Sequence, residues 1–489
     1  MTRTARKDTA KTRSQDIAII GAGFTGSLLA LHLLERSQPG DRIYLIERNA
    51  QFGRGLAYST GNPNHLLNVR AGNMSAYADQ PDHFVQWLRG LPKATQTLLN
   101  EYPTLTTFVP RGLYGSYIQQ QLGEEIWRRG HGPNLFLVTD EAVRIHREPA
   151  VSKEDGRAKP LSVEVAVGRR LPVDRCVLAT GNLLPSKNRG AIVGNPWDEK
   201  ALSNLDAQSD VVMLGSGLTM VDTVISLLDR GHRGRIVAVS RRGLLPRLHL
   251  SAGVDDLPRP WQFATPPDGR NVLKLLRHVR AACREAASQG QDWRVVIDGL
   301  RSHTQRLWQE MPVSERARFL RHLRPWWDVH RHRSATRVMA RILEAIQRRQ
   351  LMIVAGRIES MTPLDGHVSV AVRPRGKDGR LTLNAQRVLD CTALTPDISK
   401  LELPVLRNLI EGGIARPDAL GLGLDVTSVG ALIDANGKPA KDLFAVGPIT
   451  RGTFWEITAV PDIRVACETL AEHLLPADRT QSEPRRARA

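Results

Sequence analysis

Two glycine motifs, about 190 residues apart, each follow an apolar run of the kind that forms a buried strand. The first motif is GAGFTG at 21–26, after the run 16–20, and the second is GSGLTM at 215–220, after the run 211–214. Glycines at these spacings let the strand turn tightly, let a pyrophosphate approach the backbone and let the next helix pack close to the strand. Two such motifs predict two dinucleotide sites and electron transfer between them, with a reduced nicotinamide and a flavin as the favoured pair.

The first motif is followed by a second apolar run that ends in an acid. Arg42–Ile46 reads as a strand, and Glu47 lies 26 residues after Gly21. A carboxylate at this place can accept hydrogen bonds from an adenosine ribose, so the motif predicts FAD and not FMN. The competing interpretation is a glycine turn in an α/β fold without a nucleotide.

The second motif differs from the first in two ways. Met220 stands where a third glycine is expected, so we expect this helix and strand to lie slightly further apart. The strand-like run 235–239 ends in Ser240, Arg241 and Arg242 and not in an acid. An arginine pair suits a 2′-phosphate, which predicts NADPH over NADH. A solvated basic turn is the alternative.

Composition restricts the class of protein. The chain has 489 residues and 41% apolar residues, which is typical of a globular protein with two or three lobes. Its apolar runs are shorter than the roughly 18 residues of a membrane span, and no signal-peptide core precedes the first strand. The cysteines at 176, 283, 391 and 467 form no CxxC pair and no metal-ligand spacing. We therefore expect a cytoplasmic protein without a metal, a disulfide centre or a membrane anchor.

The positive charge is uneven along the chain. The net charge is +18, and residues 270–349 contain 18 Lys or Arg against 7 Asp or Glu. This segment is either a solvated helical face, a site for a small anion, or a nucleic-acid surface. Aromatic residues make up 5% of the chain and no RNA-binding motif is present, so we favour the small anion and predict no nucleic-acid partner.

We expect an α/β fold with two Rossmann-like dinucleotide-binding domains and a helical insert. Runs at 135–138, 142–145 and 162–167 are expected to form an antiparallel layer, and the run 387–393 echoes the run 176–181. Helices are expected near 81–90, 112–129 and 457–475. The expected parts are a disordered basic tail (1–15), an FAD-binding domain (16–200 and 390–476), an NAD(P)H-binding domain (201–389) holding the insert (about 251–350), and a disordered tail (477–489).

Six segments, in this order, resemble the two-dinucleotide-binding flavoproteins that include flavin monooxygenases and amine N-hydroxylases. More narrowly, they resemble the bacterial FAD/NAD(P)-binding proteins. The segments are GAGFTG at 21–26, FGRGLAY at 52–58, LATG at 178–181, GSGLTMVD at 215–222, SRRG at 240–243 and WEITAVPDIR at 455–464.

The resemblance implies the cofactors FAD and NADPH and a set of residues that bind them. On the FAD side these are Gly21, Gly23, Phe24, Thr25, Gly26, Glu47, Arg48, Asn68, Met74, Thr180, Gly181, Gly447 and Ile457. Asn68 and Met74 would lie near the flavin ring, and Gly447 with the start of a helix at Ile457 would cap the flavin. On the NADPH side they are Gly215, Gly217, Leu218, Thr219, Arg241 and Arg242. The chain departs from the superfamily at Pro448, where an Asp is usual, and at Ala393, where a Gly is usual.

The resemblance also implies an activity, namely an NADPH-dependent FAD monooxygenase. Its substrates would be a small polar or anionic metabolite and oxygen, with hydroxylation at an amine or amino-acid nitrogen or on a purine-like ring. The alternatives are an electron-transfer flavoprotein that inserts no oxygen, and a basic nucleic-acid-associated flavoprotein scaffold. Flavin chemistry requires no catalytic triad or carboxylate pair, and the sequence shows none.

The segment Trp326–Arg333 carries two tryptophans and four cationic residues. It is either part of the core and surface of the insert, or a cationic rim over an active-site cleft. Trp327 and Arg331 are four residues apart and should lie on one helical face. Together with Trp455 and Glu456, Arg331 is a candidate for the substrate side of the site. The oligomeric state stays open.

Overall fold

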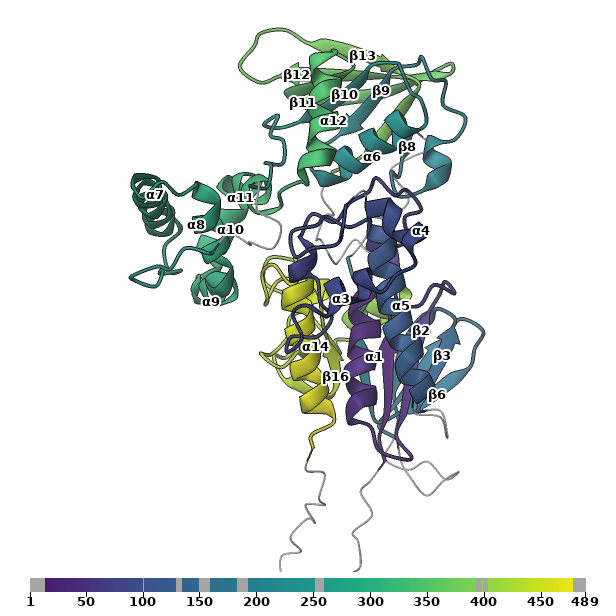
Figure 1. Ribbon diagram of the computed structural model, residues 1–489. Helices are drawn as coiled ribbons and strands as arrows, with labels where there is room; N and C mark the ends of the chain where they lie inside the picture. Colours follow the sequence, from purple (N-terminus) through teal and green to yellow (C-terminus); the bar gives the residue numbers. More distant parts are fainter. Residues whose placement is uncertain are drawn as a thin grey trace, which may run out of the picture.

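A computed structural model of the chain describes residues 14–99, 101–128, 134–148, 159–182, 192–250, 259–392, 398 and 403–477. It contains two large sheets, one in each of two stacked domains, and a lobe of helices beside them (Figure 1). The α/β class with two Rossmann-like domains is confirmed. Both predicted tails lie outside the described residues, apart from their innermost positions.

The first sheet is parallel around its centre. Its order is β15 (Ala431–Ile433), β16 (Pro439–Ala445), β7 (Arg175–Leu178), β1 (Asp16–Ile20), β2 (Arg42–Glu47) and β3 (Leu135–Thr139). Strand β1 is buried along its whole length because parallel neighbours flank both its edges and packed elements cover both faces of the sheet. The carboxyl ends of β1, β2 and β7 therefore meet at one edge of the sheet, where ligands bind in open α/β folds.

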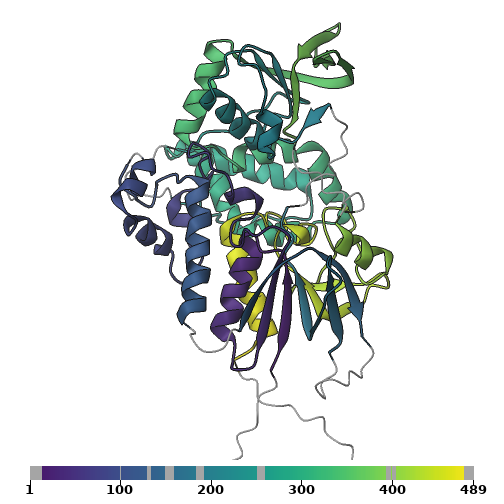
Figure 2. The same cartoon turned by 90° about the vertical axis from the view of Figure 1, so that its right-hand side faces the viewer.

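Helices cover one face of this sheet, and a small antiparallel sheet covers the other. Helices α1 (Phe24–Arg36), α5 (Arg111–Arg128) and α14 (Val460–Leu474) pack together on the first face (Figure 2). The opposite face packs on α13 (Pro404–Glu411) and on the antiparallel sheet of β4 (Ala142–Arg147), β5 (Leu161–Val165) and β6 (Arg170–Val173). The predicted helix at 81–90 is α3 (His83–Arg89). The short helices α2 (Gly55–Tyr58) and α4 (Lys93–Gln96) also lie between β2 and α5 in the chain.

Two local expectations were wrong. Strand β3 does not belong to the antiparallel layer but pairs in parallel with β2, with Leu135 opposite Ile43. It alternates between buried and more exposed residues because it is an edge strand, which imitates the pattern of a strand in an antiparallel layer. The helix expected from 457 begins at Val460, because Glu456 adopts a left-handed backbone conformation with φ of 68° and the turn around it is not helical.

The second sheet has a parallel centre and an antiparallel extension. Its order is β13 (Leu381–Ala385), β12 (His367–Pro374), β11 (Leu351–Leu364), β10 (Ile236–Ser240), β9 (Val211–Leu214), β14 (Arg387–Asp390) and β8 (Val193–Gly194). Helices α6 (Leu218–Asp229) and α12 (Thr336–Gln347) cover one face. The predicted domain boundaries stay a proposal. Because β8 belongs to the second sheet, we move the start of the second domain from residue 201 to a position before β8.

The helical lobe lies between β10 and α12 in the sequence. It consists of α7 (Val272–Ser288), α8 (Trp293–Gly299), α9 (Thr304–Glu310), α10 (Val313–His322) and α11 (Arg324–Arg331). It is narrower than the predicted insert, because α12 packs on the second sheet through Val338 and Ile342. The lobe lies on the α14 side of the first domain (Figure 1) and packs against it through Trp308 and Trp455.

Many of the basic side chains in the segment 270–349 are engaged in ion pairs. These pairs are Arg294–Asp292, Arg301–Asp462, Arg306–Glu310, Arg318–Glu315, Arg324–Asp328, Arg331–Glu456, Arg333–Asp298, Arg341–Asp229 and Arg348–Glu344. Paired arginines contribute less to a continuous positive surface than the net charge of the segment suggests.

We expect the segment 270–349 to serve a small anion or the protein surface and not a nucleic acid. Fluorescence anisotropy with labelled RNA and DNA, repeated over a range of salt concentrations, measures this directly. Nucleic-acid binding that depends on phosphate contacts falls steeply as salt rises. Submicromolar binding at physiological salt, lost when the exposed Arg277, Arg280 and Arg284 on α7 are neutralised, would contradict the expectation.

Candidate active site

The first glycine motif is packed so tightly that side chains are excluded. Gly21 has φ of 100°, and a Cβ atom on it would lie 2.5 Å from the carbonyl oxygen of Ala179. A Cβ atom on Gly26 would lie 1.8 Å from the carbonyl oxygen of Gly21. Helix α1 thus begins directly on the turn that leaves β1, with Gly23 as its N-cap and no side chain capping it. This leaves the positive end of α1 without a side-chain acceptor.

A second glycine loop, at 53–55, lies against the first. The amide of Gly53 donates to the carbonyl oxygen of Ala22 at 2.8 Å, and a Cβ atom on Gly55 would lie 2.9 Å from Cα of Gly23. Two glycine-rich backbones therefore face each other at the start of α1. The approach of backbone to backbone explains the glycine at position 55, whereas Gly53 has φ of 90° and a Cβ atom on it would lie 2.8 Å from the side chain of Gln119.

Glu47 lies at the carboxyl end of β2, beside the same turn. Its Oε2 accepts a hydrogen bond from the amide of Ala22 at 3.0 Å, and Oε1 accepts one from Asn49 at 3.3 Å. The carboxylate therefore sits at the end of β2 where a ribose is expected, as the sequence predicts. Its neighbour Arg48 points away, since its side chain is half-exposed and pairs with Glu141 at 3.8 Å.

The far side of this cradle is formed by the ends of β7 and β16. The Oγ1 atom of Thr180 is buried and has no hydrogen-bond partner among the described residues. Gly447 has φ of 80°, and a Cβ atom on it would lie 2.8 Å from the side chain of Thr25. An orphaned hydroxyl group beside a glycine-lined turn and an uncapped helix fits the diphosphate and sugar of FAD.

Three further predicted flavin-side residues lie in the same domain as this cradle. Met74 and Ile457 are buried in the core cluster that also contains Phe24. Asn68 uses its carbonyl oxygen to accept a hydrogen bond from Nε2 of His249 at 2.9 Å, and this contact crosses to the segment that follows β10. The placement of Asn68 and Met74 beside the flavin ring stays a prediction.

The second motif repeats the geometry of the first. Gly215 has φ of 97°, and a Cβ atom on it would lie 2.7 Å from the carbonyl oxygen of Cys391. Ala179 and Cys391 thus occupy equivalent places, so the echo between 176–181 and 387–393 reflects a real structural repeat. Gly217 caps α6 and has no atom within 4 Å of an added Cβ atom, which leaves open space where a dinucleotide would approach. Ala393 lies outside the described residues.

The arginine pair follows the strand end that touches the second glycine motif. The hydroxyl oxygen of Ser216 lies 2.8 Å from that of Ser240, the last residue of β10. Arg241 and Arg242 come next, and Arg241 is exposed. Binding of a 2′-phosphate by this pair stays a prediction. Leu218 and Thr219 form the first turn of α6, and Met220 is buried beneath it.

The two domains are joined through α6. His65 of the first domain lies with Nε2 at 2.8 Å from the hydroxyl oxygen of Ser226. Arg111 forms an ion pair with Asp222 at 2.5 Å. Asp229 accepts hydrogen bonds from Asn62 and Asn64. The helix that starts at the second glycine motif is thereby held against the domain of the first.

Glu456 is buried at the contact between the first domain and the lobe. Nε1 of Trp327 donates to its Oε1 at 2.9 Å, and Nε of Arg331 lies 3.4 Å from its Oε2. His332 lies 3.3 Å from Oε1. The predicted shared face of Trp327 and Arg331 is therefore confirmed, and both side chains meet one carboxylate. Burial raises the pKa of Glu456, but the charges of His332 and Arg331 and the Trp327 hydrogen bond outweigh it and hold the pKa well below its ordinary value.

The rest of the segment Trp326–Arg333 points elsewhere. The ring of His330 contacts that of Trp293 at 4.9 Å between centroids, and Arg333 forms an ion pair with Asp298. His330 and Arg331 lie in α11, whereas His332 and Arg333 follow its end, and the contacts of the four residues point in different directions, so they do not form one continuous rim. Arg331 and His332 face the first domain, while His330 and Arg333 face the lobe.

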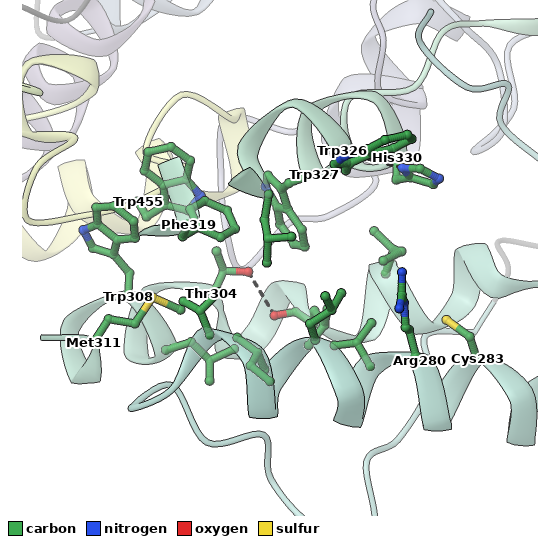
Figure 3. A pocket seen from close by; sticks show the side chains of 18 of the residues that line it. Arg280, Cys283, Thr304, Trp308, Met311, Phe319, Trp326, Trp327, His330 and Trp455 are labelled. Carbon is green, nitrogen blue, oxygen red and sulfur yellow. Dashed lines mark hydrogen bonds between the residues drawn. The ribbon is translucent and has the colours of Figure 1, made fainter. Parts of the chain in front are cut away.

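Trp455 joins this contact to a cavity in the lobe. Its ring stacks on Trp308 with 4.6 Å between centroids, and the guanidinium of Arg451 lies 4.6 Å from its centroid. The cavity has a volume of about 490 Å³ and is lined mainly by apolar side chains of α7 to α11 (Figure 3). This cavity is not among the features predicted from the sequence. The sequence signal that could have indicated it is the apolar face of α7, which includes Leu275, Leu276 and Val279 at helical spacing.

Comparison with known proteins identifies the first part of the chain. Residues 18–183 match the family model described as FAD-NAD(P)-binding, and this range contains the end of β1, both facing glycine loops, Glu47 and Thr180. The chain contains an FAD-NAD(P)-binding domain. No match was found among the curated proteins.

Beyond this FAD-NAD(P)-binding domain, the whole chain is similar to solved structures. Ornithine hydroxylase from Pseudomonas aeruginosa, in its reduced form, is 15% identical, with 95% of this chain and 99% of that chain covered and a TM-score of 0.63. L-lysine 6-monooxygenase from Pseudomonas syringae is 16% identical, with 95% and 100% covered and a TM-score of 0.61. The ornithine N-hydroxylase of Kutzneria sp. 744, with reduced FAD, NADP⁺ and L-ornithine, is 13% identical, with 94% and 99% covered and a TM-score of 0.59. At these identities the likeness establishes the fold.

The described part of the chain also lacks a metal cluster and a membrane-spanning helix. No group of three or more His, Cys, Asp or Glu side chains is placed to hold a metal ion there. Among the same residues, no helix is both long enough and apolar enough to span a bilayer.

We expect Glu456→Gln to destabilise the protein by about 3–5 kcal/mol, because Arg331 would lose the charge that compensates its burial. The folded pKa of Glu456 is depressed, so its contribution is present above its ordinary pKa of 4.5 and is lost as pH falls through the folded value. Urea unfolding at several pH values measures both effects. The difference between parent and variant should shrink as the solution becomes more acidic, and a difference that grows below pH 4.5 would contradict this account.

Proposed function

We propose that the chain is an NADPH-dependent FAD monooxygenase that hydroxylates a small molecule. The observation that carries the proposal is the repeated cradle, in which Gly21 faces Ala179 and Gly215 faces Cys391 in the same way. Helix α6 ties the second cradle to the first domain through Ser226. Two dinucleotides held in fixed relation in one chain suit transfer of reducing equivalents between them.

The residues of the first cradle would hold FAD through its diphosphate and adenosine. The amides at the start of α1 would bind the diphosphate, the carboxylate of Glu47 would accept from a ribose hydroxyl group, and Thr180 would supply its unpartnered hydroxyl group. The space above Gly217 would admit NADPH, with Arg241 and Arg242 at its 2′-phosphate. When bound, FAD supplies the chemistry by taking up electrons from NADPH and activating oxygen.

The solved structures suggest the kind of bond that is formed, because the similar enzymes are named for ornithine and lysine hydroxylation. We propose that this chain hydroxylates an amine nitrogen of a small molecule that also bears an anionic group. The balanced reaction converts an amine, O₂, NADPH and a proton to a hydroxylamine, water and NADP⁺. The four cysteines are free, which fits a reducing compartment such as the cytoplasm.

We expect Glu456 and Arg331 to act on the substrate side of the site by holding other residues in position. Their charges are buried against one another, so they hold the Trp455 turn and α11 together. We therefore propose them as positioning residues and Trp455 as the residue of this group nearest to a bound substrate. Loss of Arg331 should alter substrate affinity and the yield of product per NADPH more than the anaerobic rate of flavin reduction.

Purified protein should be yellow and should release FAD on heating, identified by its mass. NADPH should reduce the bound flavin under anaerobic conditions, and added oxygen should reoxidise it. With amines and amino acids as candidates, a true substrate should yield one hydroxylated product per NADPH and suppress release of hydrogen peroxide. Recovery of FMN, or reduced flavin that passes electrons to dyes but not to oxygen, would refute the proposal.

A further inference from the structure

The cavity in the helical lobe is unusually rich in tryptophan. Five of the nine tryptophans of the chain line it, namely Trp293, Trp308, Trp326, Trp327 and Trp455. Four of them come from the lobe, and Trp455 comes from the segment that precedes α14 in the first domain. The volume of the cavity, about 490 Å³, lies within the range of roughly 300–1,000 Å³ that is usual for small-molecule sites.

The cavity has two chemically different ends. Figure 3 shows Trp308, Met311 and Trp455 together at one end, and Arg280, Cys283 and His330 together at the other. Apolar side chains of α7 line the space between them. A ligand that fills it would need an apolar body and a polar group directed toward Arg280.

Charge indicates the sign of that polar group. No described residue that lines the cavity carries a carboxylate, whereas Arg280 and His330 both lie at its polar end. Three of the tryptophan rings already bear a guanidinium near one face. These are Trp293 with Arg294 at 4.4 Å, Trp455 with Arg451 at 4.6 Å and Trp308 with Arg316 at 5.3 Å. Arg294 is paired with Asp292, so the like charge that a cationic ligand would meet comes from Arg280, Arg451 and Arg316, and the cavity favours an anion.

We propose that this cavity binds an aromatic acid, with its ring among the tryptophans and its anionic group at Arg280. Flat ring systems pack on tryptophan faces and edges in preferred geometries, which suits a rigid aromatic ring better than a flexible polar chain. The end at Trp455 adjoins the FAD-NAD(P)-binding domain, so the part of the ligand farthest from its acid group lies nearest to the flavin side. Its role as the substrate site rests on the proposed monooxygenase function, whereas the binding itself does not.

Equilibrium binding tests the proposal without turnover. The probes are naphthalene-2-carboxylate, its cationic counterpart 2-naphthylmethylammonium, and neutral naphthalene, followed by tryptophan fluorescence in the flavin-loaded protein without NADPH. The acid should bind saturably and at least tenfold more tightly than the cation. Arg280→Ala should weaken binding of the acid by about tenfold and leave binding of naphthalene unchanged. The matched control is Arg277→Ala, because Arg277 is exposed like Arg280 and lies on the same helix but does not line the cavity.

A second variant locates the site. Leu276→Trp places a large side chain in the cavity and should abolish binding of the acid and of naphthalene, while the melting temperature of the variant shows whether it folds. Equal affinity for acid and cation, or acid binding that survives both Arg280→Ala and Leu276→Trp, would overturn the proposal. Acid binding by a protein that proves to carry no flavin would leave the site intact and remove its role as a substrate pocket.

Discussion

Gly26→Ala should abolish FAD binding, with a loss of affinity of at least about 100-fold, or roughly 2.7 kcal/mol. The added Cβ atom would lie 1.8 Å from the carbonyl oxygen of Gly21, which belongs to the turn that must cradle the diphosphate. Relief of this overlap requires α1 to move away from β1, and its first amides move with it. The measurement is titration of the apoprotein with FAD, followed by flavin fluorescence.

The matched control for this substitution is Gly123→Ala. Gly123 also lies inside a helix, α5, but an added Cβ atom there has no atom within 4 Å. Alanine is favoured over glycine in a helix by about 1 kcal/mol, so this variant should bind FAD normally and be as stable as the parent or more so. Thermal unfolding of both apoproteins separates loss of the site from loss of the fold. A folded Gly26→Ala protein that binds FAD within threefold of the parent would show that the close approach is unimportant.

Arg241→Ala should weaken the use of NADPH by roughly 10- to 150-fold and leave the use of NADH nearly unchanged. A hydrogen bond to a charged group contributes about 1.5–3 kcal/mol, and NADH has no 2′-phosphate to receive it. The measurement is the rate of anaerobic flavin reduction as a function of each nucleotide concentration, so that oxygen chemistry does not enter.

Arg233→Ala serves as the control for net charge. Arg233 is exposed and precedes β10 at its amino end, whereas Arg241 follows the carboxyl end of the same strand. Its loss should leave both nucleotides unaffected. Equal kinetics of NADPH and NADH in the parent protein, or parallel losses for both nucleotides in Arg241→Ala, would refute the assignment of the 2′-phosphate site.

The fold and the cofactor cradles were predictable because their signals are local. A glycine at position 21 or 215 follows a strand directly, and its need for a positive φ is set by the turn itself. Glu47 and Arg241 follow the next strand in each half, so their distance from the motif follows from the length of one β-α-β unit. In the same way, the shared face of Trp327 and Arg331 follows from helical spacing alone.

The placement of elements that look alike depended on tertiary packing. Strand β3 alternates as an antiparallel strand would, and its pairing with β2 is decided by the edge of the sheet that stays open. Helix α12 has the same amphipathic pattern as the helices of the lobe, and its contact with the second sheet is decided by the return of the chain into β11. Periodicity shows that a face is buried but not which partner buries it.

The contacts between the first domain and the helical lobe were determined by tertiary structure alone. Glu456 meets Trp327 across 129 residues, and Trp455 stacks on Trp308 across a similar separation in the sequence. The tryptophans of the lobe could be read from the sequence as core residues, and the cavity between them exists because α7 and α11 lie apart where their apolar faces oppose each other. Sequence by itself therefore determined the two glycine motifs and the turns that they form, since backbone turns act over a few residues. The packing of distant helices decided the cavity and the buried ion pair, since both depend on contacts that no local spacing encodes.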